Sequence, residues 1–414
     1  MKTTIKLAVA SALVAAATSA NAGIVIPAGD WTLDIGGNVN AFYSHNTGES
    51  RAGSAATAAG AVASLEDNAA GENKVSTITT GLLPSFLSVS GKTRQNDLDV
   101  GFTISIQPGV AQDTNLGNAG QENRQAFLTF GDKSWGTIKL GRDLGIFAST
   151  AIWSDMTLLG VGGAGANRTG TTTLGGIGTG YIYADWKAQI SYASPNWNGF
   201  SFAAGIMQPW NNTTATATAT NNVVAGAVSQ STTTPGFEAQ ATYEWAGDVA
   251  GKVWAGAIYQ KVQDLGATGQ FGDETARGFD VGAQVNVAGF GLTGYYYDGK
   301  GIGTTGFLAN AFDDQGRRRD SDGGYVQATY TLPGVGTKLG LAYGVSNLDN
   351  TSRDATLNNN LVDKNERWTV GAYHPLTKHL NLVAEYNRTS SESHRTNVKD
   401  ADNDNVSLGA ILFF

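Results

Sequence analysis

The chain has 414 residues, no cysteine, and a formal charge of −8 from 27 basic and 35 acidic residues. The lack of cysteine excludes disulfides and thiolate metal sites, and the acidic balance argues against a nucleic-acid partner. Glycine is abundant at 55 residues, but 9 Trp, 14 Tyr and 16 Phe exclude a collagen-like or disordered chain.

Residues 1–22 have the layout of a secretory signal peptide. Lys2 and Lys6 precede an apolar run from Leu7 to Ala17, which a small-residue site at Ala20-Asn21-Ala22 follows. The run is shorter than the roughly 20 apolar residues that a spanning helix needs. We expect cleavage after Ala22 and export, with a mature formal charge of about −10 once Lys2 and Lys6 are removed. No later stretch reaches about 18 uninterrupted apolar residues, which excludes a helical membrane protein.

The mature chain alternates apolar and polar residues from one end to the other. In residues 31–43, Trp31 and Leu33 share one face, whereas Thr32 and Asp34 share the other. The alternation returns at 98–107, 237–245, 279–286, 380–387 and 406–414. Each of these segments predicts a β-strand with one apolar and one polar side.

Turn-forming residues separate these strands by connections that alternate between short and long. Short connections rich in Gly, Pro, Asn, Asp and Ser occur at 91–96, 131–136, 195–199, 246–251, 288–291, 333–337 and 375–379. Long polar connections occur at 44–76, 108–122, 143–180, 209–235, 264–276, 300–322, 347–365 and 390–404. This pattern predicts about sixteen strands, with both termini at the same end.

A soluble β-sandwich would show the same alternation. Charges at mid-strand on the polar faces, together with the alternating connections, favour an all-β, transmembrane antiparallel β-barrel with a wet lumen. A closed barrel pairs its backbone groups between neighbours and can therefore cross a lipid core. We expect residues 23–414 to form one outer-membrane barrel domain, with the long connections outside and the short ones in the periplasm.

Several short motifs resemble those of the general bacterial porins of the Gram-negative outer membrane. They are Arg124-Gln125-Ala126-Phe127-Leu128, Trp135-Gly136-Thr137-Ile138-Lys139-Leu140-Gly141-Arg142, the segment from Ile190 to Phe200, and the terminal Phe414. The resemblance implies a homotrimer of sixteen-stranded barrels, each with an infolded third loop and a water-filled channel for passive diffusion of small hydrophilic solutes and ions. It also implies contact with outer-membrane lipid and lipopolysaccharide, and recognition of Phe414 by the barrel-assembly machinery.

By this resemblance, residues 143–180 form the constriction loop, where the family sets loop acids against basic groups of the wall. The resulting transverse field orients dipolar solutes and biases ions. The candidate pore-constriction residues are Asp143 and Asp155 on the loop, with Arg168 as a basic exception, and Arg124, Arg142, Lys187 and Asp185 on the wall. Asp185 shares a face with Lys187 and is expected to pair with it. Alternatively, a loop aspartate caps a turn, Arg124 lies at the membrane interface, and Arg142 holds the root of the loop.

Acidic residues point inward by parity at Asp34, Asp97, Asp99, Glu238, Glu244, Asp280 and Glu385. Phe86 and Ser191 occupy positions that are often basic in the family. Together with the negative net charge, this predicts a mild preference for cations.

The remaining charged clusters indicate no other chemistry. Arg317-Arg318-Arg319 lies among loop acids, which favours a self-neutralising outer loop, with a loop folded into the vestibule as the alternative. Asp400, Asp402 and Asp404 lack the Gly and Glu of a calcium loop. The four histidines offer no triad of nucleophile, base and orienting group, so we expect no enzyme, metal or cofactor. A substrate-selective porin, and a plugged barrel acting as an adhesin or receptor, remain the alternative functions.

Overall fold

The computed structural model describes residues 23–48, 54–63, 73–111, 120–163, 172–211 and 229–414. The expected signal peptide at 1–22 and the candidate Arg168 lie outside these ranges. None of the described helices is long and apolar enough to cross a membrane.

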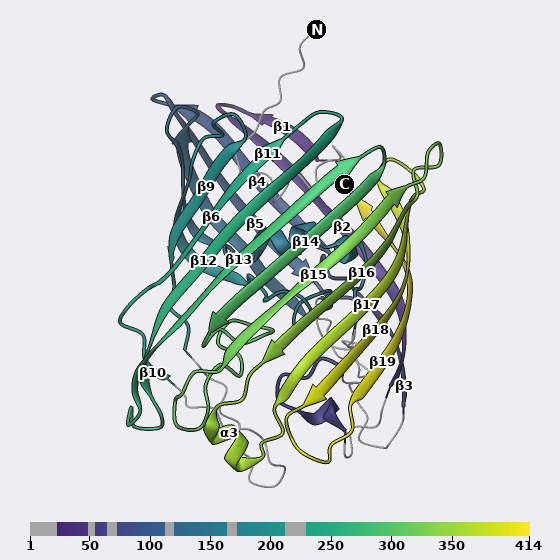
Figure 1. Ribbon diagram of the computed structural model, residues 1–414. Helices are drawn as coiled ribbons and strands as arrows, with labels where there is room; N and C mark the ends of the chain where they lie inside the picture. Colours follow the sequence, from purple (N-terminus) through teal and green to yellow (C-terminus); the bar gives the residue numbers. More distant parts are fainter. Residues whose placement is uncertain (1–22, 49–53, 64–72, 112–119, 164–171, 212–228) are drawn as a thin grey trace.

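A single antiparallel sheet contains all of the described strands (Figure 1). Its first strands are β1 (Ile24–Ala28), β2 (Trp31–Gly48), β3 (Lys74–Thr79), β4 (Phe86–Gln95), β5 (Leu98–Pro108), β6 (Gln121–Asp132), β7 (Gly136–Leu144), β8 (Trp186–Ala193) and β9 (Phe200–Met207). Its later strands are β10 (Ser229–Ser231), β11 (Gly236–Trp245), β12 (Val249–Leu265), β13 (Gly272–Val287), β14 (Phe290–Lys300), β15 (Asp320–Thr331), β16 (Lys338–Leu348), β17 (Val362–Pro375), β18 (Leu380–Ser393) and β19 (Ala401–Phe413). Short helices lie in the connections: η1 (Ala55–Thr57), α2 (Ser149–Ser154), η3 (Met156–Leu159) and α3 (Ser352–Leu357).

The sheet closes on itself into a barrel. The last strand, β19, pairs with β2 from Phe413 opposite Asn38 to Asn403 opposite Gly48. β3 and β4 pair with successive halves of β2, and β10 and β11 pair with successive parts of β12, so each couple forms one interrupted strand. With β1 set aside as a hairpin extension of β2, the described residues form a closed barrel of 16 strands, as the sequence predicts.

The predicted alternation is confirmed along the wall. In β17, Trp368 and Val370 are exposed on the outside, whereas Arg367 and Thr369 are buried on the inside. Leu382 and Tyr386 of β18 are likewise exposed, and Glu385 between them is buried. Many large apolar and aromatic side chains are exposed along the wall, which is the surface that a hydrocarbon environment requires.

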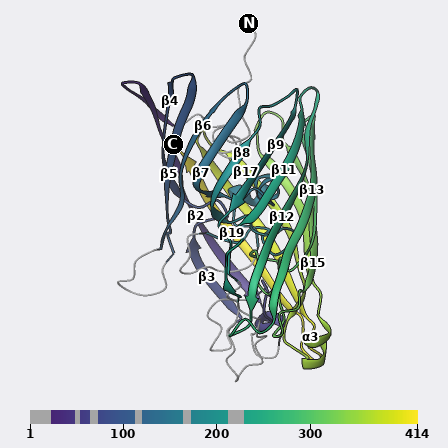
Figure 2. The same ribbon diagram turned by 90° about the vertical axis from the view of Figure 1, so that its left-hand side faces the viewer.

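The short connections lie at the predicted places, but several long connections are shorter than the sequence indicates. Residues 394–400 alone join β18 and β19, not 390–404. β12 continues to Leu265 and β13 starts at Gly272, so residues 266–271 alone join them, not 264–276. The polar ends of these strands were predicted as loop because, beyond the hydrocarbon, both faces of a strand can be polar. Figures 1 and 2 both show α3 at the lower end of the barrel, opposite the short β4–β5 turn.

Candidate functional site

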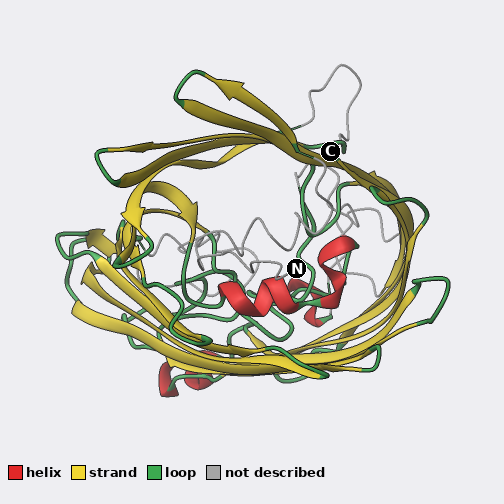
Figure 3. Cartoon of the chain, turned by 90° about the horizontal axis from the view of Figure 1, so that it is seen from above, coloured by secondary structure: helices red, strands yellow, loops and turns green. Residues whose placement is uncertain are grey.

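The connection between β7 and β8, residues 145–185 and hereafter loop 3, lies inside the barrel in its described part. Figure 3 shows helical turns within the ring of strands. Phe147, Ala148 and Tyr181 of loop 3 are almost completely buried. They pack in one apolar cluster with inward-facing aromatic residues of the wall, Trp254, Tyr295 and Tyr325. One side of the lumen is therefore filled by the chain itself.

Three carboxylates of the wall bind backbone N–H groups of loop 3. Glu238 on β11 accepts from Ile146 at 2.6 Å and from Phe147 at 2.9 Å. Asp280 on β13 accepts from Ala148 at 3.1 Å. Glu385 on β18 accepts from the amides of residues 161 and 162 at 2.9 and 2.8 Å. Because these strands are spread around the barrel, loop 3 follows the wall from β11 to β18.

All three carboxylates are buried, so they are not free charges facing water. A buried carboxylate is tolerated only where donors replace its hydration, and the loop amides supply those donors. Tyr295 donates to Asp280 at 3.1 Å, and Tyr373 donates to Glu385 at 2.7 Å. Parity correctly places these acids inside, but their role in the structure is to hold the loop.

Arg367 of β17 is a buried charge of the lumen that was not among the candidates from the sequence. Its guanidinium lies 3.4 Å from the carboxylate of Asp155 in loop 3 and donates to the carbonyl of Gly162 at 3.3 Å. Asp155 also accepts from the hydroxyl of Tyr181 at 2.8 Å and caps η3 through the amide of Thr157. The turn-capping alternative for Asp155 is therefore observed, together with a wall arginine. The sequence contained a signal for Arg367, because it alternates in phase with Thr369 and therefore faces the lumen.

Lys187 of β8 is buried and pairs with Glu238 of β11 rather than with Asp185. Its ammonium group also lies 5.4 Å from the ring of Trp210 and 5.3 Å from that of Phe307. The expected Asp185–Lys187 pair is wrong because Asp185 precedes β8 in a left-handed conformation, with φ of 55°, so strand parity does not extend to it. Its carboxylate accepts from the amide of Trp186 at 2.6 Å, and burial raises its pKa.

Arg124 and Arg142, the two wall arginines of the family motifs, lie in different environments. Arg124 is buried, pairs with Glu122 at 2.7 Å and lies 5.6 Å from the ring of Trp186. It follows a register shift between β5 and β6, so parity does not predict its direction. Arg142 is exposed, whereas its neighbour Asp143 is buried. The expectation that Arg142 lines the pore is wrong: it shares the outward phase of Ile138 and Leu140, a signal already present in the sequence.

Asp143 ends β7 inside the lumen. It pairs with Lys139 of the same strand and accepts from the side-chain amide of Gln125 at 3.0 Å. Its charge is therefore balanced by a base that the sequence analysis did not select. Lys139 has the same inward parity as Asp143 and lies 4.9 Å from the ring of Phe127.

A second segment also enters the lumen at the break between β3 and β4, residues 80–85. The amide of Leu82 donates to the carbonyl of Gly160 in loop 3 at 2.8 Å. Asn40 of β2 donates to the carbonyl of Leu83 at 2.9 Å and so replaces the interrupted strand pairing. Residues 80–85 show no period-two alternation, and in the structure this segment supports loop 3.

The arginine run Arg317-Arg318-Arg319 is not neutralised within its own loop, residues 301–319 or loop 6. Arg319 forms a fully buried pair with Asp354 of α3 at 2.7 Å, and Arg318 pairs with Glu274 of β13 at 3.1 Å. Phe307 and Phe312 of loop 6 pack in the same cluster as loop 3. The inward-folded alternative for this loop is thus the one observed.

Within the described ranges, no group of three or more His, Cys, Asp or Glu residues could hold a metal ion. The buried wall carboxylates Glu238, Asp280 and Glu385 instead accept hydrogen bonds from loop 3. Such an arrangement positions a loop inside a barrel.

A model of the Gram-negative porin family matches residues 8–394 of the chain. The chain belongs to this family. This porin therefore forms a water-filled channel in the outer membrane through which small hydrophilic solutes and ions diffuse passively. No curated relative matches it.

Solved outer-membrane proteins share the fold of this porin. The outer membrane channel DcaP of Acinetobacter baumannii has a TM-score of 0.66 and 18% identity, over 94% of this chain and 99% of that one. OmpF of Salmonella typhi, in complex with daunomycin, has a TM-score of 0.59 and 15% identity, over 94% and 100%. Outer-membrane expressed OmpT of Vibrio cholerae has a TM-score of 0.53 and 14% identity, over 94% and 100%.

Proposed function

We propose that loop 3 forms the constriction of this porin and that solutes pass between it and the wall of β4 to β7. The anchoring of loop 3 to carboxylates of β11, β13 and β18 carries this proposal, because it holds the loop against one side of the lumen. On the opposite side, inward-facing side chains of β4, β6 and β7 remain half-exposed: Ser88, Ser90, Phe127, Thr129 and Lys139.

Single cysteines test this path, because the chain contains none of its own. Thr129 of β6 is half-exposed on the inward face that borders this path. We expect a bulky methanethiosulfonate reagent to lower the single-channel conductance of Thr129→Cys markedly. The matched control is Leu128→Cys, whose side chain is exposed on the outer face. Equal, unchanged conductance in both variants would contradict the proposed path.

We also propose that the preference for cations is weak. On the inward faces near the short-turn end, Asp34 and Glu244 are exposed, and Asp99 pairs with Arg94 at 2.9 Å. Asp97, which was expected to point inward, lies in the β4–β5 turn with φ of 63°. The acids deeper in the lumen are occupied by Lys139, Lys187, Arg367 or loop amides. A reversal potential measured in a potassium chloride gradient should indicate a small excess of potassium over chloride. A chloride excess would refute this sign.

The assembly and processing follow from the resemblance to the family. We propose a homotrimer, cleavage after Ala22, contact with lipopolysaccharide, use of Phe414 as the assembly signal, and no catalytic activity. One solved relative, OmpT of Vibrio cholerae, is described in a trimer form. Three equal closing steps in a single-channel record would support the trimer, and a single step would contradict it.

A further inference from the structure

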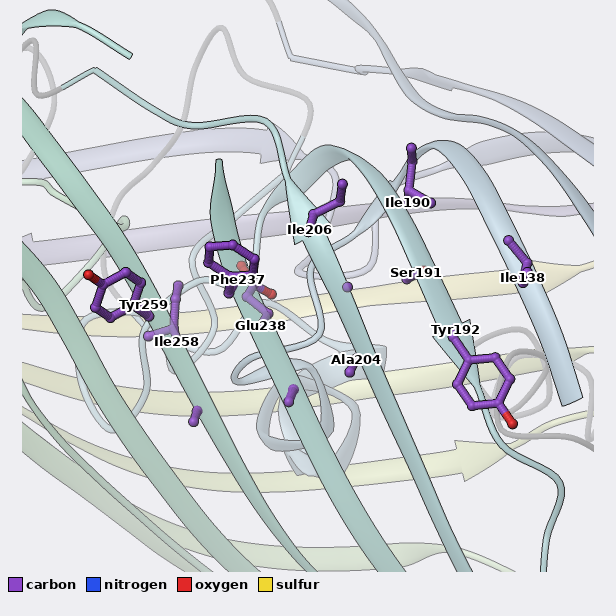
Figure 4. Close-up of a pocket in the computed structure, with 13 residues that line it drawn as sticks. Ile138, Ile190, Ser191, Tyr192, Ala204, Ile206, Phe237, Glu238, Ile258 and Tyr259 are labelled. Carbon is purple, nitrogen blue, oxygen red and sulfur yellow. The ribbon is translucent and has the colours of Figure 1, made fainter. Parts of the chain in front are cut away.

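The apolar side chains on the outside of the barrel are explained by the lipid that surrounds it. Ile190, Ile206 and Phe237 are successive cross-strand partners, are exposed, and lie on neighbouring strands in Figure 4. Glu238, the next residue of β11, has the opposite parity and is buried inside. Hydrocarbon accounts for the outer apolar row. It does not account for apolar surface that faces the water of the lumen.

The lumen has such an apolar surface where loop 3 meets β4. Phe86, the first residue of β4, pairs with the buried Asn38 of β2 and points inward. Together with Trp153 and Leu158 of loop 3, it packs against one buried cluster. That cluster consists of Leu83, Ile411 and Phe413. Phe86, Trp153 and Leu158, hereafter the inner patch, are only half-buried, so the rest of each side chain faces the lumen.

Backbone contacts hold the inner patch in place. The amide of Leu83 donates to the carbonyl of Leu158 at 3.3 Å, and the amide of Leu82 donates to the carbonyl of Gly160 at 2.8 Å. Trp153 packs in addition against the large apolar cluster that loop 3 forms with the wall. The inner patch is therefore preformed, and a solute that contacts it need not order the surface first.

The wall of the proposed path adds a second aromatic ring among polar groups. Phe127 of β6 is half-buried, and the ammonium group of Lys139 lies 4.9 Å from the centre of its ring. Lys139 pairs with Asp143, so the charge beside the ring is balanced. Ser88 of β4 and Thr129 of β6 are half-exposed on the same inward face. A solute on this path therefore meets apolar rings and hydrogen-bonding groups together.

We propose that this channel favours small amphipathic solutes that carry an aromatic ring, such as the aromatic amino acids. The inference rests on the proposed path between loop 3 and the wall of β4 to β7. The inner patch and Phe127 contact the ring, whose burial against apolar side chains is favourable. The hydroxyl groups of Ser88 and Thr129 receive the polar part of the solute. Such contacts raise the occupancy of the channel at low solute concentration, and their partial exposure keeps binding weak enough for release.

Block of the single-channel potassium chloride current tests the proposal, with tryptophan, phenylalanine and glutamine as probes. Tryptophan and phenylalanine should reduce the current saturably, whereas glutamine, which is zwitterionic but has no ring, should not. Phe86→Ser should raise the tryptophan concentration for half-maximal block by about tenfold, because the solute ring loses apolar contact. Phe86→Leu, which keeps apolar surface, should raise it by no more than about threefold. The matched control is Leu87→Ser, at the next position of β4 but exposed on the outer face, which should leave it unchanged.

Leu158→Ser tests the same surface from loop 3 and decides the matter where Phe86→Ser does not fold. It should raise the tryptophan concentration for half-maximal block by about fivefold. Equal block by tryptophan and glutamine in the unaltered porin would overturn the proposal, even where the reagent still blocks Thr129→Cys and the proposed path holds. A changed conductance in potassium chloride with unchanged tryptophan block in both variants would also overturn it, because the inner patch would then only support loop 3.

Discussion

At the scale of single residues, the lumen is organised by how each buried charge is compensated. Lys187 has Glu238 as its counter-charge, and Glu238 additionally holds two amides of loop 3. Arg367 meets Asp155 in the same way. In a confined space a charge without a partner is costly, so each pair fixes a piece of the loop to a particular strand.

Glu238→Gln tests this role. The substitution keeps the shape of the side chain but leaves Lys187 buried without a counter-charge, which should lower the free energy of unfolding by about 3–5 kcal/mol. Urea titration in detergent micelles measures the change. Glu244→Gln, at an exposed position of the same strand, should alter it by less than about 0.5 kcal/mol. Equal effects of the two substitutions would show that the Glu238 pair does not hold the loop.

At the scale of elements, loop 6 and loop 7 (residues 349–361) are joined by a buried ion pair. Arg319 binds both carboxylate oxygens of Asp354, at 2.8 and 2.7 Å, and donates to the carbonyl of Phe312 at 2.7 Å. Asp354 also completes a capping box with Thr351 at the start of α3. Two loops that are distant in sequence therefore behave as one unit at the mouth of the barrel.

The substitution Arg319→Met should loosen the contact between loop 6 and loop 7. Loss of one partner from a buried pair costs about 3–5 kcal/mol, so protease cleavage within loops 6 and 7 should become much faster while the barrel remains intact. Arg353→Met is the control, because Arg353 pairs with Asp314 at a partly exposed position, 2.8 Å apart. Cleavage as slow as in the control would show that the ion pair between Arg319 and Asp354 does not restrain the loops.

The buried ion pair between Arg319 and Asp354 should also weaken in acid. Burial favours protonation of Asp354, but the bonds from Arg319 outweigh it and hold the pKa of Asp354 below its usual 3.8. A carboxyl with a lowered pKa stabilises the folded state above pH 3.8 and loses that contribution as the pH falls through the folded value. The stability difference between the unaltered porin and Arg319→Met, measured by urea titration, should be constant at neutral pH and shrink below about pH 3.8. A difference that grows on acidification would contradict this sign.

At the scale of the whole molecule, the closure between β19 and β2 completes the barrel. Phe414 exchanges backbone hydrogen bonds with Gly37 at 2.9 and 3.0 Å, so the terminal residue extends the pairing with β2 beyond the end of β19. A side chain at Gly37 would meet both the carbonyl of Phe86 and the ring of Phe414. The pairing of β2 with the C-terminal residue thus depends on a close backbone approach.

Deletion of Phe414 should lower the free energy of unfolding by about 1–3 kcal/mol, because two hydrogen bonds and an aromatic contact between β2 and the C-terminus are lost. The fraction of folded barrel after refolding, measured from its heat-modifiable mobility in gel electrophoresis, should fall. Phe414→Tyr should retain the folded fraction, since the backbone bonds and ring remain. Normal refolding of the deletion variant in vitro would show that Phe414 does not stabilise the pairing of β19 with β2. Normal refolding in vitro together with poor assembly in cells would show that Phe414 acts only as an assembly signal.

The sequence by itself determined the sixteen-stranded architecture and the inside or outside position of residues such as Glu238, Asp280 and Glu385. These follow from period-two alternation and turn chemistry, which are local properties of the chain. Only the tertiary structure decided which charges meet. Arg367 with Asp155, Lys187 with Glu238, and Arg319 with Asp354 are distant in sequence, and their pairing depends on loop paths that carry no periodic signal. Parity also fails where the register shifts, as at Arg124, and where a strand ends, as at Asp185, because one irregular residue changes the face of a side chain.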